Sequence, residues 1–129
     1  MDIEKLLRDH RRVAVVGISA NPERPSHWIA RYLQEKGYEV VGVNPGLPKI
    51  PGLRIVATLK EAQPLEIVDV FRSPDAIPAL VEEVAPLKPV VFWLQPGAEN
   101  PEAEARAREL GLEVISGNCI YQEHRSRLA

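Results

Sequence analysis

The segment Val13–Gly17, Val-Ala-Val-Val-Gly, most constrains what this chain can fold into. Four apolar residues that end at a glycine are typical of a buried parallel strand running into a tight turn. Asn21 and Pro22 follow, and a helix-like segment begins after them. A turn between a strand and a helix presents free backbone N–H groups, and the helix dipole adds partial positive charge. The segment therefore predicts a strand–turn–helix unit suited to a phosphate or a pyrophosphate.

The details of this turn argue against an ordinary NAD site. In a dinucleotide-binding G-x-G-x-x-G sequence the second and third glycines would stand where this chain has Ser19 and Pro22. An NAD site also needs an acid at the end of the second strand, where it bonds a ribose hydroxyl. The second predicted strand, Glu39 to Val43, is instead followed by Asn44 and Pro45.

Apolar runs and turn residues predict five or six strands alternating with helices. The expected strands are Arg12–Ile18, Tyr38–Val43, a short Arg54–Val56, Ile67–Phe71, Val90–Leu94 and Glu113–Ser116. Alternating strands and helices with short connections indicate right-handed βαβ units. We therefore predict one domain over residues 1–129, of the α/β class, with a three-layer Rossmann-like fold around a parallel sheet.

Helical periodicity places the predicted helices between these strands. A short amphipathic helix with Ile3, Leu6 and Leu7 opens the chain, and a segment from Tyr121 to Ala129 forms a short helix or a frayed tail. Two of the other helices are expected to have N-caps at Ser73 and Asn100. The helix that ends near Gly37 is predicted to bury Trp28, Ile29, Tyr32 and Leu33, and the helix before the last strand Ala103, Ala107 and Leu110.

Composition excludes several classes of function. Apolar residues make up 45% of the chain and charged residues 26%, which is ordinary for a globular protein. A formal net charge of −2 gives no bulk attraction to nucleic acid or to an anionic membrane. A single cysteine excludes an internal disulfide, and the sequence contains no signal peptide or long apolar segment. We expect a cytoplasmic protein with no nucleic-acid or membrane partner.

Ligands of such sheets bind beyond the carboxyl ends of the strands, near the point where the strand order reverses. This rule selects candidate binding residues from the predicted strand ends. They are Gly17, Ile18, Ser19, Ala20 and Arg24 after the first strand; Asn44, Pro45 and Lys49 after the second; Phe71, Arg72 and Ser73; Gln95, Pro96 and Gly97; and Asn118 and Cys119. Several helix N-termini and up to three cations converge on one edge, which suits an extended polyanionic ligand.

Each candidate also has a purely structural interpretation. Gly17 could serve strand–helix packing alone, Ser19 could satisfy a turn N–H, and Ser73 could act only as an N-cap. Arg24, Lys49 and Arg72 could be solvated surface charges, and Cys119 a small buried apolar residue. The case for a site rests on their shared location.

No catalytic constellation is evident. The sequence has no G-x-S-x-G elbow, no Walker A motif and no cluster of cysteines or histidines with metal-ligand spacing. Asp69 falls within a predicted buried strand and needs a partner, so it is either a satisfied core acid or a positioning residue. We assign no catalytic residue and no metal ligand.

Short blocks spread along the chain resemble one known family. They are Val15–Ser19, Asn21–Ser26, Gly37–Val40, Val43–Pro45, Asp69–Arg72, Trp93–Gly97 and Asn118–Ile120. Together they resemble the CoA-binding domain family, from about Val13 to His124, and the N-terminal domain of the succinyl-CoA synthetase α subunit. The resemblance implies that Gly17 to Ala20 hold the CoA phosphates. It implies that the Leu94-Gln95-Pro96 turn borders the pantetheine arm. In the synthetase a lysine after the second strand contacts CoA, and Lys49 is the lysine of this chain nearest to that position.

The synthetase's phosphorylated histidine belongs to a later domain, so the resemblance does not extend to the ligase half-reaction. The leading hypothesis is therefore non-catalytic binding of CoA or acyl-CoA. Three alternatives stay open: a small NADP- or nucleotide-dependent enzyme, a redox-linked CoA binder that forms a mixed disulfide at Cys119, and a subunit that docks onto a larger partner. A homodimer is the default assembly for a chain of this kind.

Overall fold

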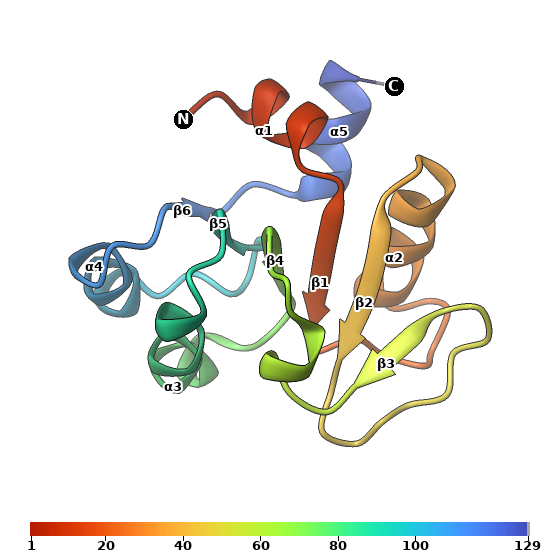
Figure 1. The fold of residues 1–129 in the computed structure, drawn as a ribbon, viewed down its shortest axis with the longest axis horizontal. Coiled ribbons are helices and arrows are strands. Elements are labelled where there is room, and N and C mark those ends of the chain that lie inside the picture. The colour runs from red at the N-terminus through yellow and green to blue at the C-terminus, as the bar shows by residue number, and fades with distance from the viewer. Residues whose placement is uncertain (129) are drawn as a thin grey trace.

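Six parallel strands form one sheet in the computed structural model, which describes residues 1–128 (Figure 1). The strands are β1 Arg12–Val16, β2 Glu39–Val43, β3 Arg54–Val56, β4 Ile67–Val70, β5 Val91–Leu94 and β6 Val114–Ser116. Their order in the sheet is β3-β2-β1-β4-β5-β6, so the strand order reverses between β1 and β4. This is the doubly wound Rossmann order. The predicted α/β class is confirmed.

Helices cover both faces of the sheet (Figure 1). They are α1 Ile3–Asp9, α2 Pro25–Glu35, α3 Ile77–Val84, α4 Pro101–Glu109 and α5 Ile120–Arg127, with 3₁₀ turns at Lys60–Ala62, Pro74–Ala76 and Ala85–Leu87. The apolar faces of α3 and α4 pack on one side, and those of α1, α2 and α5 on the other. The expected C-terminal helix is therefore present, and only Ala129 of that expectation lies outside the described residues.

Side-chain alternation along the central strands explains the two layers. Val13 and Val15 of β1 point to the layer of α1, α2 and α5, whereas Ala14 and Val16 point to the layer of α3 and α4. Because both faces are buried, the strands read as continuous apolar runs.

Two predicted inner stripes were partly wrong. In α2, Ile29 and Leu33 are buried as expected, but Trp28 is 40% exposed and Tyr32 is only half-buried. Ala30 completes the buried stripe, and Trp28 and Tyr32 contact aromatic side chains of α5. Leu110 is 38% exposed because α4 ends one residue before it, at Glu109.

One of the two predicted N-caps is confirmed. The Asn100 side chain accepts a hydrogen bond from the Ala103 N–H at 3.1 Å. Ser73 forms no such bond to the helix backbone, because its hydroxyl donates to the Asp75 carboxylate.

Asp69 is a buried acid without the expected partner. It lies on β4 between Val15 of β1 and Trp93 of β5, and it has no exposed surface. Neither carboxyl oxygen has a hydrogen-bond partner within residues 1–128. Burial raises the pKa of Asp69 well above its ordinary value, because the apolar surroundings disfavour the charged form.

This pKa shift predicts how the stability depends on pH. Above the ordinary pKa of an aspartate, the unfolded chain releases the proton that the folded chain retains, so the free energy of unfolding falls as pH rises. We expect Asp69→Asn, which cannot ionise, to stabilise the fold by an amount that grows by up to about 1.4 kcal/mol per pH unit. Urea unfolding of both proteins at about pH 4.5 and about pH 7.5 checks this; an equal effect at the two pH values would contradict it.

Candidate functional site

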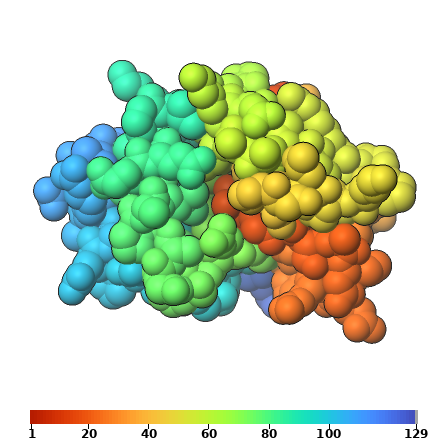
Figure 2. Space-filling model, turned by 90° about the horizontal axis from the view of Figure 1, so that it is seen from below, coloured from red at the N-terminus to blue at the C-terminus, as the bar shows by residue number. Residues whose placement is uncertain are grey.

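A cleft of about 1080 Å³ lies at the carboxyl edge of the sheet. Loops that follow β1, β2, β4 and β5 line it, together with the first turns of α2 and α5. Figure 2 looks onto this edge: the blue C-terminal segment is visible between the green and the orange segments. The cleft therefore includes the reversal of strand order, where doubly wound sheets bind their ligands.

Gly17 brings the loop after β1 into direct contact with the end of β4. Its φ is +85°, a left-handed conformation that glycine adopts without steric cost. A Cβ built on Gly17 would overlap the carbonyl oxygen of Phe71 and would stand 2.9 Å from Cδ of Arg72. The predicted glycine is therefore required by both conformation and space.

Hydrogen bonds within the loop after β1 hold its shape. The Ser19 hydroxyl accepts from the Asn21 N–H, and the Ser26 hydroxyl accepts from the Ser19 N–H, each at 3.0 Å. Nδ1 of the buried His27 lies 2.8 Å from the Ser19 carbonyl oxygen. Within residues 1–128, the N–H groups of Ile18 and Ala20 donate to no protein acceptor. Ala20 is exposed, so its N–H group is available to an anion, whereas Ile18 is fully buried.

The charges at the cleft are all positive. Arg24 and Arg72 line it, are exposed, and form no ion pair within the described chain. The pKa of Asp75 is lowered, first by the Ser73 hydroxyl bond and in smaller part by the charge of Arg72. No aspartate or glutamate is among the residues of the described chain that line the cleft. A chain of net charge −2 thus presents a locally cationic cleft.

Asn44 ties the end of β2 to the loop after β1. Its Nδ2 donates to the Ile18 carbonyl at 2.9 Å, and its Oδ1 accepts from the Gly46 N–H at 2.8 Å. Both polar groups of the side chain are therefore engaged by the backbone. At the position where an NAD site has an acid that binds the ribose, this chain therefore has Asn44, whose side chain bonds the protein backbone.

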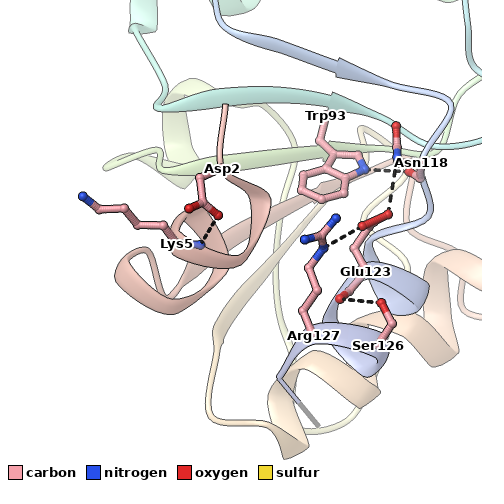
Figure 3. A network of polar contacts seen from close by, with 7 residues as sticks. All are labelled: Asp2, Lys5, Trp93, Asn118, Glu123, Ser126 and Arg127. Carbon is pink, nitrogen blue, oxygen red and sulfur yellow. Dashed lines mark hydrogen bonds and ion pairs between the residues drawn. The ribbon is translucent and has the colours of Figure 1, made fainter.

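Polar contacts fix the start of α5 against β5. The buried Gln95 side chain accepts from the Ile120 N–H at 2.9 Å. The Trp93 indole N–H donates to the Asn118 carbonyl at 2.7 Å, and the Asn118 amide reaches Glu123, which pairs with Arg127 (Figure 3). Cys119, at the N-cap position of α5, is half-buried and lines the cleft.

An aromatic corner joins α2 to α5 on one wall of the cleft; we use this term for Trp28 and Tyr121. Their ring centroids are 5.0 Å apart, with planes at 84°. Tyr32 supports Tyr121 edge-on at 4.7 Å, and the Tyr32 hydroxyl lies 2.7 Å from Nδ1 of the buried His124. The pKa of His124 is lowered, first by burial and then by the charges of Lys36 and Arg11. Burial and these charges therefore favour the neutral form of the imidazole.

The structure brings most of the predicted binding residues to this one cleft. Those that line it are Gly17, Ile18, Ser19, Ala20, Arg24, Asn44, Pro45, Phe71, Arg72, Ser73, Gln95, Pro96, Gly97 and Cys119. Lys49, Leu94 and Asn118 do not. Lys49 is exposed outside the cleft, Leu94 is buried in the layer of α3 and α4, and Asn118 anchors α5.

Sequence reasoning missed eight residues of the lining. They are Pro25, Ser26, Trp28, Ile29, Pro48, Ala98, Tyr121 and Gln122. Four of them belong to the first turns of α2, which directly follow the predicted phosphate loop and could have been included on that ground. Nothing in the sequence indicated that α5 returns to α2.

Within residues 1–128, no group of three or more histidine, cysteine, aspartate or glutamate side chains is arranged to hold a metal ion. Among the described helices, none is long and apolar enough to span a bilayer.

A doubly wound parallel sheet with a cationic cleft at the reversal of its strand order defines a Rossmann-like α/β protein. Residues 11–125 match the CoA binding domain, and the chain belongs to this family.

Three known proteins illustrate the similarity. The uncharacterized protein YneT of Bacillus subtilis (strain 168) is 39% identical over 124 residues, which are 95% of this chain and 92% of YneT. The Thermus thermophilus protein cell-free ID.343 has a TM-score of 0.92 and 36% identity, covering 99% of this chain and 100% of its own. The dinucleotide forming acetyl-coenzyme A synthetase 1 of Ca. Korarchaeum cryptofilum has a TM-score of 0.69. At 22% identity over 91% of this chain and 28% of that one, it shows a shared fold alone.

Proposed function

We propose that this protein binds CoA or a CoA thioester in the cleft without transforming it. The observation that carries the proposal is an acid-free cleft in a CoA-binding-domain protein, with two unpaired arginines and a free N–H group after β1. Phosphates are the ligand groups that such donors favour. The lining residues of the described chain include no carboxylate, histidine or lysine, which leaves Cys119 and Tyr121 as the lining side chains that could transfer a proton.

The fold suggests how CoA would lie. The diphosphate would accept from the exposed Ala20 N–H group, with Arg72 beside it, because this loop follows the strand at the reversal of strand order. The first half of a doubly wound sheet binds the adenosine, which directs that end toward Pro45 and Pro48. Arg24 would then hold the ribose 3′-phosphate, and the pantetheine arm would run past Gln95 toward Cys119.

Isothermal titration with CoA, dephospho-CoA and NADP tests the proposal. We expect CoA to bind most tightly, because dephospho-CoA lacks the 3′-phosphate and the end of β2 has no free group for a nicotinamide dinucleotide's ribose. Preference for NADP would favour a nucleotide-dependent enzyme instead. Absence of binding to all three would reject the proposal.

A second candidate function follows from the position of Cys119. Its thiol lines the cleft at the end that the pantetheine sulfur would reach. The Cys119 thiolate would attack one sulfur of CoA disulfide; the S–S bond breaks, a Cys119–CoA disulfide forms, and the other CoA leaves as a thiolate that takes up a proton.

Intact-mass spectrometry after incubation with CoA disulfide checks this reaction. We expect a single CoA adduct that is reversed by a reducing agent and absent in Cys119→Ser. An unmodified wild-type mass would remove the redox role and would leave CoA binding untouched.

A further inference from the structure

We infer that the aromatic corner of Trp28 and Tyr121 is a subsite for the uncharged acyl group of a CoA thioester. The inference rests on the proposed function, because it assigns a role to one end of the same cleft. It goes further by naming the class of ligand: a thioester in preference to free CoA, and an apolar acyl group in preference to a dicarboxylic one.

The first argument is the exposure of Trp28. Of the two tryptophans, Trp93 is fully buried, whereas Trp28 is 40% exposed on a cleft wall. A large aromatic side chain that lines a concave site and is not covered by the protein is typical of a ligand contact. Ile29 lies beside it in the lining and supplies further apolar surface.

The second argument is rigidity. Tyr121 is held between Trp28 at 5.0 Å and Tyr32 at 4.7 Å, both edge-on. Tyr32 is in turn fixed by the 2.7 Å contact of its hydroxyl with the buried His124. An apolar surface that is already ordered loses little conformational entropy when a ligand binds to it.

The third argument is position. The two helices that meet at the corner, α2 and α5, both begin at the carboxyl edge of the sheet. Adenosine belongs at the end of β2, so the opposite end of the ligand must leave the phosphate loop toward β5 and α5. Cys119, Tyr121 and Gln122 line that side of the cleft.

Charge indicates the kind of acyl group. The lining at this end consists of Trp28, Ile29, Cys119, Tyr121 and Gln122, none of which is charged. Arg24, at the N-cap position of α2, lines the cleft one helical turn before Trp28, and Arg125, outside the lining, donates to the Tyr121 hydroxyl at 3.3 Å. Because we assign Arg24 to the ribose 3′-phosphate, a carboxylate on the acyl group would lose hydration at the corner without a free lining cation to pair with.

Titrations with CoA, acetyl-CoA, butyryl-CoA and succinyl-CoA test the inference. For the wild type we expect affinity to rise by up to about four-fold per methylene that becomes buried, so butyryl-CoA binds most tightly. Trp28→Ala should abolish this rise, so that the variant binds butyryl-CoA no more tightly than free CoA. Leu110→Ala is the matched control, because Leu110 has a similar exposure, 38%, and lies outside the cleft.

Each outcome is decisive. Equal affinity of the wild type for CoA and butyryl-CoA, or a rise that survives in Trp28→Ala, would overturn the subsite. Tighter binding of succinyl-CoA than of butyryl-CoA would overturn the preference for an uncharged group. Absence of wild-type binding to free CoA and to all three thioesters would instead reject the proposed function.

Fluorescence gives an independent readout. Because Trp93 is buried and its indole N–H is bonded to Asn118, a change in emission that butyryl-CoA causes and free CoA does not would arise from Trp28. Trp28→Phe should keep the preference for butyryl-CoA and lose this emission change. The same emission change in Trp28→Phe would contradict the assignment.

Discussion

Gly17→Ala is expected to cost about 2–5 kcal/mol of folding stability and to abolish ligand binding. The φ of +85° alone penalises a residue with a Cβ by about 1–2 kcal/mol. The added methyl group would also overlap the Phe71 carbonyl and crowd the Arg72 side chain. Overpacking of this kind costs about 1–3 kcal/mol more, because the strand ends must separate. Urea unfolding measures the loss.

Gly111→Ala separates the conformational cost of a positive φ from the steric cost of the added methyl group. Gly111 has a similar φ of +90°, but a Cβ there would meet nothing within 4 Å. We therefore expect this variant to lose only the conformational part, about 1–2 kcal/mol, and to bind CoA normally. If Gly17→Ala were no less stable than Gly111→Ala, the close approach of the β1 and β4 loops would not be the reason for the glycine.

Arg24→Ala should lower the affinity for CoA by about 10- to 100-fold and barely change the affinity for dephospho-CoA. A hydrogen bond between an arginine and a phosphate contributes about 1.5–3 kcal/mol, and only CoA carries the 3′-phosphate that we assign to Arg24. The substitution should leave the fold intact, because Arg24 is exposed and outside all ion pairs of the described chain.

Arg72→Met is expected to differ from Arg24→Ala in its effect on the two ligands. Its stem lies against Gly17, and methionine retains much of that stem while removing the charge. Since we assign Arg72 to the diphosphate, this variant should lower the affinities for CoA and for dephospho-CoA by similar factors of about 10- to 100-fold. Calorimetric titration of both variants with CoA and dephospho-CoA measures these affinities. Equal losses of affinity for the two ligands in Arg24→Ala would reject the assignment of Arg24 to the 3′-phosphate.

The order of elements was predictable from the sequence because each signal is local. Val13–Gly17 and the later apolar runs mark strands by their lack of polar residues, and Asn100 marks a helix start by its side chain. Periodicity does not reveal what faces a helix from elsewhere in the chain. Trp28 and Tyr32 have the spacing of core residues, but their neighbours are Tyr121 and His124, about ninety residues later.

The residues of the site also divide into those that local sequence signals predict and those whose position depends on distant parts of the chain. Residues directly after the strands, such as Gly17, Arg72 and Gln95, could be predicted because parallel strands bring their carboxyl ends to one edge. Tyr121 and Gln122 could not, because their place depends on α5 crossing back to α2. Asp69 shows a further limit: the sequence indicated a buried acid, but only the packing reveals that its carboxyl has no partner.

Backbone amide chemical shifts measured by NMR during titration with CoA test the central claim most directly, because they report both binding and its location. We expect the largest changes at the loop from Gly17 to Ser26, at Phe71–Ser73 and at the start of α5. A second, smaller hollow at the amino ends of the strands includes Arg12, Glu39 and Glu66. Changes confined to that hollow, or no change at saturating CoA, would contradict CoA binding in the cleft.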